Sequence, residues 1–257
     1  MNDAHLHLQD ARFHDIRESI ILQMRDAGVA RCVVNGTSPD DWPLVAELAR
    51  QHEDLIIPSF GLHPWKPVTK GWLDPLEEYL TDFPSAGIGE CGLDRWVQNH
   101  DIAEQTEVFK QHIRLAAMQN RALSIHCLKA WGLLMEVLQS QPLPERGFLL
   151  HSYSGSRELI APLVELGAYF SFSGYFLHER KANVRETFRH VPADRLLLET
   201  DAPDMAPPPI LSSAPCPQNK YLISAKINHP ANLRCIYQET AKFLDLSEVD
   251  NNFDRLF

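Results

Sequence analysis

The sequence lacks the features of a membrane, secreted or fibrous protein. Of its 257 residues, 44% are hydrophobic and 23% are charged, which suits one globular domain over residues 1–257 and argues against a disordered chain or a fibre. No apolar run reaches the roughly 20 residues that span a bilayer. The start, Met1 to His5, lacks the basic and then apolar order of a signal peptide. We therefore expect a cytoplasmic protein without a membrane partner, and we expect a monomer.

An excess of positive charge is also missing. Lys and Arg number 24 against 34 Asp and Glu, which gives a formal net charge of −10. No summed positive field is available to draw the whole surface onto a polyanion. Any contact with nucleic acid must therefore be local.

Cysteine is scarce and scattered. Cys32, Cys91, Cys127, Cys216 and Cys235 are odd in number and include no C-x-x-C pair. This pattern indicates neither a disulfide framework nor a thiolate zinc site. We expect reduced, mostly buried thiols.

What the sequence does contain is a repeated alternation of short apolar runs and longer amphipathic segments, the pattern of parallel strands joined by helices. Strands are predicted at Asn2–Leu6, Ala30–Val34, Leu55–Phe60, Ala86–Glu90, Ala122–His126, Phe148–His151, Tyr169–Ser173 and Leu196–Thr200. Helices are predicted at Ile16–Ala27, Pro43–His52, Leu73–Phe83, Ile102–Gln119, Lys129–Ser140, Arg157–Leu166, Lys181–His190 and Ala231–Leu244, with a last turn toward Phe257. Eight such rounds in about 250 residues indicate an α/β fold, a (β/α)8 TIM barrel. A doubly wound open sheet is the second possibility.

Histidines and carboxylates gather where the predicted strands end, and in a barrel these ends meet over one mouth. In chain order they are His5 and His7 at the end of the first strand, His63 after the third, Glu90 ending the fourth, His126 ending the fifth, His151 ending the sixth and Asp201 after the eighth. Each signal alone is modest, since a His-x-His pair can be chance and a single histidine is more often a core residue. A buried dinuclear metal site accounts at once for four of these five histidines and for both carboxylates, so we favour that interpretation.

Six motifs in order resemble the TatD-like metal-dependent hydrolases. They are His5-Leu6-His7, Gly61-Leu62-His63-Pro64, Gly89-Glu90-Cys91-Gly92-Leu93-Asp94, Ser124-Ile125-His126-Cys127, His151-Ser152-Tyr153-Ser154-Gly155-Ser156 and Glu199-Thr200-Asp201-Ala202-Pro203. The resemblance covers essentially the whole chain. It implies a metal-dependent hydrolase barrel of the amidohydrolase type with one or two divalent cations, and many members of the family are deoxyribonucleases.

Carried over by position, the resemblance implies that His5, His7 and Asp201 hold one ion and that His126 and His151 hold the second. Glu90 would bridge both ions, and His63 would contact phosphate or substrate. Imidazole and carboxylate ligands suit Mg²⁺, Mn²⁺ or Zn²⁺ without selecting one of them.

Two ions about 3.5–4 Å apart would lower the pKa of a water held between them and make a hydroxide nucleophile. Asp201 is our candidate for the residue that orients this water and takes its proton. Glu90, through the bridged ions, belongs to the same catalytic set.

Further residues on loops at the mouth are candidates for contacts with substrate. Ser154 and Ser156 precede a predicted helix and could bind an anion, although an ordinary helix cap is equally plausible. Arg95 and Lys129 could contact phosphate, but solvated surface charge is the commoner explanation. Trp65 and Trp96 could stack a base or pack in a lid. We expect Asp94 to orient a loop or a ligand histidine.

The predicted function is a metal-dependent hydrolase of phosphodiester bonds, a deoxyribonuclease or 3′-exonuclease. Its partner would be a nucleic acid, with DNA favoured, or a small phosphate ester. A second possibility keeps the metals but opens a cyclic amide, ester or lactone. The net charge of −10 favours this alternative, as does Leu128, which stands where many members have arginine. A third is a metal-binding barrel without catalysis, against which all six candidate ligands argue.

Overall fold

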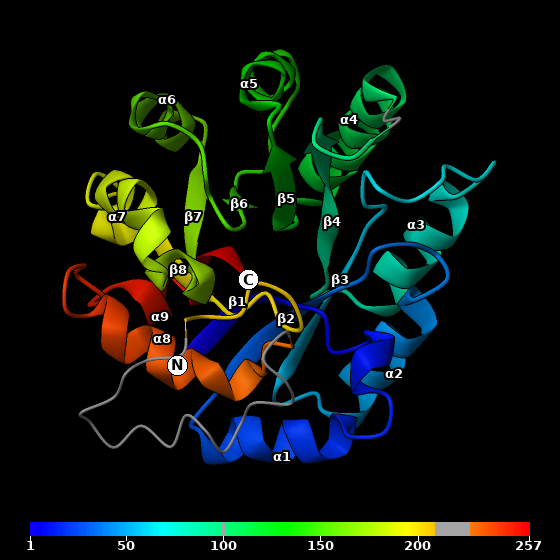
Figure 1. Cartoon of the computed structure of the whole chain (residues 1–257). Helices are drawn as coiled ribbons and strands as arrows, with labels where there is room; N and C mark the ends of the chain where they lie inside the picture. Colours follow the sequence, from blue (N-terminus) through cyan, green and yellow to red (C-terminus); the bar gives the residue numbers. More distant parts are fainter. Residues whose placement is uncertain (99–100, 209–226) are drawn as a thin grey trace.

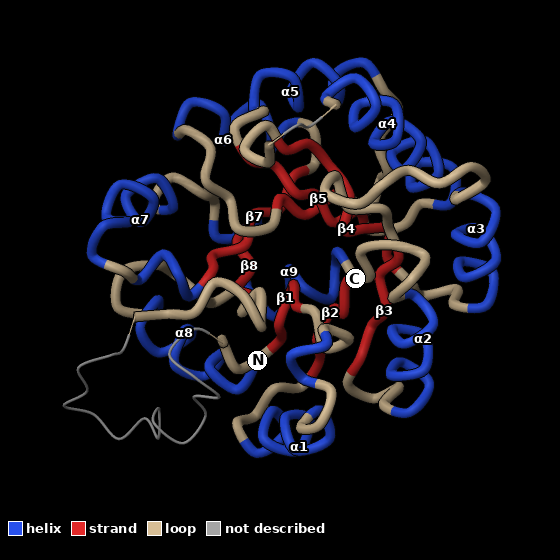
Figure 2. Tube along the Cα trace, turned by 45° about the vertical axis from the view of Figure 1, so that its right-hand side comes forward, coloured by secondary structure: helices blue, strands red, loops and turns tan. Residues whose placement is uncertain are grey.

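A computed structural model describes residues 1–98, 101–208 and 227–257. Within them, eight parallel strands follow one another around a ring in sequence order, and a helix follows each strand on the outside (Figures 1 and 2). The strands are β1 (Asn2–Leu6), β2 (Arg31–Asn35), β3 (Ile56–Phe60), β4 (Gly87–Asp94), β5 (Leu123–Leu128), β6 (Phe148–Leu150), β7 (Ala168–Ser173) and β8 (Leu196–Glu199). The helices are α1 (Arg17–Asp26), α2 (Trp42–Gln51), α3 (Leu73–Asp82), α4 (Ile102–Gln119), α5 (Trp131–Ser140), α6 (Ile160–Glu165), α7 (Ala182–Phe188), α8 (Leu233–Thr240) and α9 (Val249–Leu256).

The ring closes where β1 meets the segment after β8. The backbone N–H of Asp201 donates to the carbonyl of His5 at 2.9 Å, and the N–H of His7 donates to the carbonyl of Ala202 at 2.8 Å. Asp3 adds side-chain acceptors for the backbone N–H and the hydroxyl of Thr200. The predicted (β/α)8 barrel is confirmed, and the open doubly wound sheet is wrong because the strand order never reverses.

The barrel interior has an apolar end and a polar end. Small and branched residues of the strands form one buried cluster with the aromatic end of α9: Ala4, Val33, Ile57, Ala122, Leu149, Tyr169, Leu197, Phe253, Leu256 and Phe257. In Figure 2, α9 lies within the ring of strands. A larger cluster fills the space between the strands and the outer helices. The interior at the carboxyl ends of the strands is therefore left for polar groups.

Two strands run further than predicted. Glu90 and His126 were expected to end their strands, but β4 continues to Asp94 and β5 to Leu128, and Gly92 pairs with His126 across them. Gly92 makes this pairing possible, because a Cβ at this position would lie 2.0 Å from the carbonyl oxygen of His126. The predicted strand therefore stopped short of a segment in which β4 passes unusually close to its neighbour.

The sixth helix is shorter than the predicted Arg157–Leu166. A 3-10 turn at Arg157–Leu159 precedes α6. Pro162 has no N–H to donate to the carbonyl of Glu158, so a regular α-helix can begin only in the turn just before the proline.

The cysteine prediction holds only in part. Cys32, Cys91 and Cys127 are free and buried, whereas Cys235 is disulfide-bonded, so the expectation of a thiol there is wrong. The absence of a C-x-x-C pair does not exclude a disulfide, because the fold can bring together cysteines that are further apart in the sequence. Cys216 lies outside the described residues. No helix in the described part of the chain is long and apolar enough to cross a bilayer.

His112 ties α4 to the loop after β3. Its Nδ1–H donates to the carbonyl of Val108 at 2.8 Å, and its Nε2 accepts from the backbone N–H of Leu62 at 3.0 Å, next to His63. The ring is fully buried and stacks on Trp72. Burial lowers the pKa of His112 from 6.5 to about 4.

We predict that His112 makes the free energy of unfolding depend on pH. Above pH 6.5 the ring is neutral in both the folded and the unfolded chain. Between pH 6.5 and about 4 only the unfolded chain gains a proton at this site, so stability falls as the pH falls. At about 1.4 kcal/mol per pKa unit the loss is on the order of 3 kcal/mol. Urea unfolding of wild type and His112→Gln between pH 7.5 and 4 should show a shallower pH dependence in the variant. Parallel curves would contradict the prediction.

Candidate metal centre

The centre lies at the carboxyl end of the barrel, around the side chain of Glu90. Glu90 is 3% exposed and sits inside β4 where the register with β5 shifts, between Ile88 and Cys91. Gly61 and Gly89 let the end of β3 approach this part of β4, because a Cβ at Gly61 would lie 2.6 Å from the Cα of Gly89. The strand irregularity and the close approach place the carboxylate in the barrel interior.

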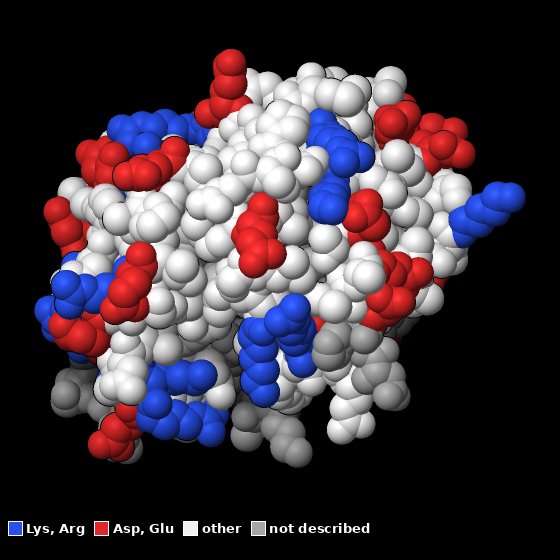
Figure 3. Space-filling view, turned by 90° about the horizontal axis from the view of Figure 1, so that it is seen from above, with Lys and Arg blue, Asp and Glu red and all other residues white. Residues whose placement is uncertain are grey.

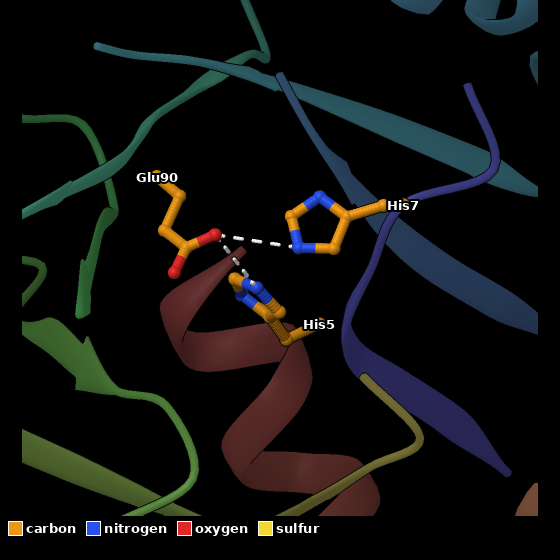
Figure 4. A group of neighbouring side chains, drawn as sticks. All are labelled: His5, His7 and Glu90. Atoms are coloured by element: carbon orange, nitrogen blue, oxygen red, sulfur yellow. Dashed lines mark ion pairs between the residues drawn. The ribbon is translucent and has the colours of Figure 1, made fainter. Parts of the chain in front are cut away.

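Five histidines surround the two oxygens of this carboxylate. Oε2 of Glu90 lies 3.4 Å from Nε2 of His5 and 3.3 Å from Nε2 of His7 (Figure 4). Oε1 faces three more ring nitrogens, at 3.3 Å for His63, 3.1 Å for His126 and 2.9 Å for His151. The histidines that the sequence analysis selected at separate strand ends therefore meet at one carboxylate.

Asp201 completes the set from the other side of the barrel seam. Its Oδ1 lies 3.8 Å from Nε2 of His5 and 3.6 Å from Nε2 of His7. Asp201 has a φ of 51°, in the left-handed region, which Asp adopts more readily than most residues. This local conformation, together with its backbone bond to His5, brings the carboxylate back over the end of β1.

His5 shows that these residues fit a cation. Its side chain is completely buried, yet neither ring nitrogen forms a hydrogen bond within the described residues. Buried polar atoms are normally satisfied, so an unpartnered nitrogen beside two carboxylates marks a place for a positive ligand. Three groups of side chains bring ligand atoms within 4.8 Å of one another: His5, His7 and Glu90; His5, His151 and Asp201; and His63, Glu90 and His126.

The titratable groups of the centre shift one another's pKa values. Burial lowers the pKa of His5 to about 4, and the neighbouring His151 adds to this effect. Burial also acts to lower the pKa of His7, but the Glu90 carboxylate outweighs it and the pKa rises to about 9. For Glu90, burial opposes ionisation, and the surrounding histidines overcome it and hold its pKa well below the usual value. Burial raises the pKa of Asp201 to about 7. His5 is therefore a neutral imidazole, the form that binds a metal.

Asp94 orients His126. Its Oδ2 accepts a hydrogen bond from Nε2 of His126 at 2.8 Å, which leaves Nδ1 of that ring facing Glu90. The same oxygen accepts from the indole N–H of Trp65, and Oδ1 accepts from the backbone N–H groups of Trp96 and Val97. The expectation that Asp94 holds a ligand histidine and a loop agrees with these contacts.

A family model described as TatD related DNase matches residues 2–257. The chain belongs to the TatD family.

Two curated relatives and one solved structure illustrate the similarity. The 3′-5′ ssDNA/RNA exonuclease TatD of Erwinia tasmaniensis is 32% identical over 228 residues, which cover 84% of this chain and 87% of that protein. YcfH of Escherichia coli K12, described as an uncharacterized metal-dependent hydrolase, is 26% identical over 264 residues, or 99% of this chain and 94% of that protein. The crystal structure of YjjV, a TatD homolog from Escherichia coli, has a TM-score of 0.88 at 24% identity and covers 100% of this chain and 97% of that chain. The last comparison shows the shared fold.

In this TatD family protein, His63 lies at the centre, whereas the four loop residues predicted to contact substrate are exposed. His63 was assigned to substrate contact, but its Nε2 lies as close to Glu90 as the candidate ligands do. Arg95 and Lys129 are exposed and make no ion pair with any residue that the structure describes. Ser154 and Ser156 are exposed too, and Ser156 begins only a three-residue 3-10 turn without a side-chain capping bond. Substrate contact by these four residues stays a prediction.

Sequence reasoning missed Glu199. This carboxylate is completely buried at the end of β8 and accepts hydrogen bonds from the hydroxyls of Ser152 and Ser171. Its Oε1 lies 3.7 Å from Nδ1 of His151, whose Nε2 faces Glu90. Burial opposes the charge of Glu199, but the neighbouring His151 ring, together with the hydroxyl of Ser152, outweighs it and lowers the pKa of the carboxyl. The signal was present in the sequence as a second acidic residue closing an apolar strand.

We predict that Glu199→Gln weakens cation binding by about 10- to 100-fold, because the side chain would no longer fix the ring of His151. Calorimetric titration of the metal-free protein with Mn²⁺ measures the change. Ser152→Ala is the matched control, since it removes one hydroxyl from the same carboxylate and keeps the charge, and it should cost much less. Equal affinities for Glu199→Gln and wild type would show that Glu199 does not position His151.

Proposed function

We propose that the chain is a divalent-metal-dependent nuclease that hydrolyses phosphodiester bonds of single-stranded nucleic acid from the 3′ end. The observation that carries the proposal is the single buried carboxylate of Glu90 with five imidazoles at 2.9–3.4 Å and Asp201 beside them. Family membership supports it, as does the exonuclease named among the relatives.

The candidate ligands can serve two adjacent cations. His5, His7 and Asp201 would hold one, and His126 with His151 would hold the other, with Glu90 between them. When bound, such cations supply Lewis acidity at a phosphoryl oxygen and activate water. Mg²⁺, Mn²⁺ and Zn²⁺ all stay candidates, because imidazole and carboxylate donors bind each of them.

Residues of the chain then have distinct tasks in the reaction. Asp201 lies beside His5 and His7, where its carboxylate would orient the attacking water and accept its proton at an Oδ atom. Asp94 and Glu199 hold the rings of His126 and His151 in place. No serine or cysteine nucleophile is needed.

The charge on the surface is consistent with local recognition. On the face shown in Figure 3, Lys and Arg side chains are scattered among Asp and Glu. With a net charge of −10, binding of a polyanion depends on the cations and on groups at the mouth. A monomeric state, a cytoplasmic location and a preference for DNA stay predictions.

The alternative substrate class is a small cyclic amide, ester or lactone. Leu128 favours it, since this partly buried apolar side chain stands at the end of β5 where many members of the family have arginine. A metal-binding barrel without catalysis is disfavoured because Asp201, the proposed acceptor of the proton, is present beside the histidines.

We predict that Asp201→Asn lowers nuclease activity by at least about 100-fold, because the amide cannot take the proton from water. The variant should keep its far-UV circular dichroism spectrum and at least one equivalent of Mn²⁺ by elemental analysis. Asp204→Asn is the matched control: this exposed carboxylate lies three residues away and pairs with Arg12 at 2.7 Å. An active Asp201→Asn variant would remove the assignment.

The substrate class is tested with the wild-type protein and Mg²⁺ or Mn²⁺. A short single-stranded DNA and its RNA counterpart, labelled at the 5′ end, should shorten one nucleotide at a time from the 3′ end. EDTA should stop the reaction and added cation should restore it. A panel of lactones and cyclic amides should remain intact. Turnover of a lactone without cleavage of either oligonucleotide would select the alternative.

A further inference from the structure

Trp65 presents a large aromatic surface next to the metal centre. Its side chain is 52% exposed, although it lies only two residues after His63. The centre of its ring system lies 5.0 Å from that of His63 and 6.0 Å from that of His126, with interplanar angles of 86° and 71°. Trp65 therefore meets two candidate ligands edge to face while much of its surface remains open to solvent.

The indole is held in place. Its N–H donates to Oδ2 of Asp94 at 2.8 Å, and its backbone N–H donates to Nδ1 of His63 at 3.1 Å. The Asp94 oxygen that binds Trp65 is the one that binds His126. The position of the ring is thus fixed relative to the centre by the same carboxylate that orients a ligand.

Core packing does not explain the position of Trp65. Neither of the two hydrophobic clusters formed by the described residues includes it. A half-exposed tryptophan held by polar bonds gains little from burial in the free protein. Its open surface is therefore available for a planar partner that arrives at the mouth.

We propose that Trp65 stacks on a nucleobase of the substrate next to the bond that is cleaved. This inference rests on the proposed nuclease function. Every base has an aromatic face, so stacking would secure the strand end without selecting a sequence. It would also compensate for the scarcity of fixed positive charge. The residue would act on substrate affinity, whereas the metal centre acts on the rate of cleavage.

The test compares wild type, Trp65→Phe and Trp65→Ala. Both variants lose the bond to Asp94, but only Trp65→Phe keeps an aromatic face. Each protein is given a single-stranded oligonucleotide with ordinary 3′ nucleotides and one that ends in tetrahydrofuran abasic units. For Trp65→Ala on the ordinary strand, KM should rise about 5- to 100-fold with kcat little changed. Trp65→Phe should stay within a few-fold of wild type.

The abasic strand separates stacking from structural damage. Removing the bases should cost wild type about as much as Trp65→Ala costs on the ordinary strand, with no further loss when both changes are combined. An unchanged KM for Trp65→Ala would overturn the proposal. So would equal losses for Trp65→Phe and Trp65→Ala, because the bond to Asp94 would then be responsible.

Binding distinguishes failure of this inference from failure of the proposed function. Fluorescence anisotropy of the labelled ordinary strand is measured with the same three proteins in Ca²⁺. If wild type cleaves neither strand but Trp65→Ala still binds at least 5-fold more weakly than Trp65→Phe, stacking stands and the nuclease assignment falls. If wild type does not bind the strand, both fall.

Discussion

The structure depends on one constraint, the need to stabilise the buried charge of Glu90. A carboxylate removed from water is costly unless opposite charge or hydrogen bonds compensate for it. Here the compensation comes from imidazoles on or just after β1, β3, β5 and β6, so four parts of the barrel must be in register at the same time. The apolar cluster around α9 supports this arrangement from the opposite end by fixing the spacing of the strands.

Outside the ring of histidines lies a second set of carboxylates. Asp94 binds Nε2 of His126 and leaves Nδ1 for the centre, whereas Glu199 faces Nδ1 of His151 and leaves Nε2. The two histidines therefore present different ring atoms to the same oxygen of Glu90. Each outer carboxylate also binds groups beyond the histidine, the Trp65 indole in one case and two serine hydroxyls in the other. In this way the centre is connected to the loops that border the mouth.

The barrel, and the meeting of the candidate ligands at one end of it, could be predicted from the sequence because both depend on pattern. Short apolar runs give the strand order, and His5, Glu90 and Asp201 follow such runs. The features that could not be predicted depend on how closely residues from different segments approach one another in space. The pairing of Gly92 with His126 requires a close backbone contact that no local pattern encodes. Likewise, the position of His63 beside Glu90 follows from the approach of segments that are remote in the sequence.

The seam between β1 and the segment after β8 joins the first and the last strand of the barrel. Thr200 and Asp3, which bond across it, are 197 positions apart in the chain. A contact of such large separation carries a large entropic cost of loop closure. His5 and His7 on one side of the seam and Asp201 on the other therefore lie together only in the closed barrel. The contacts that keep this seam closed consequently also keep the candidate ligands on its two sides together.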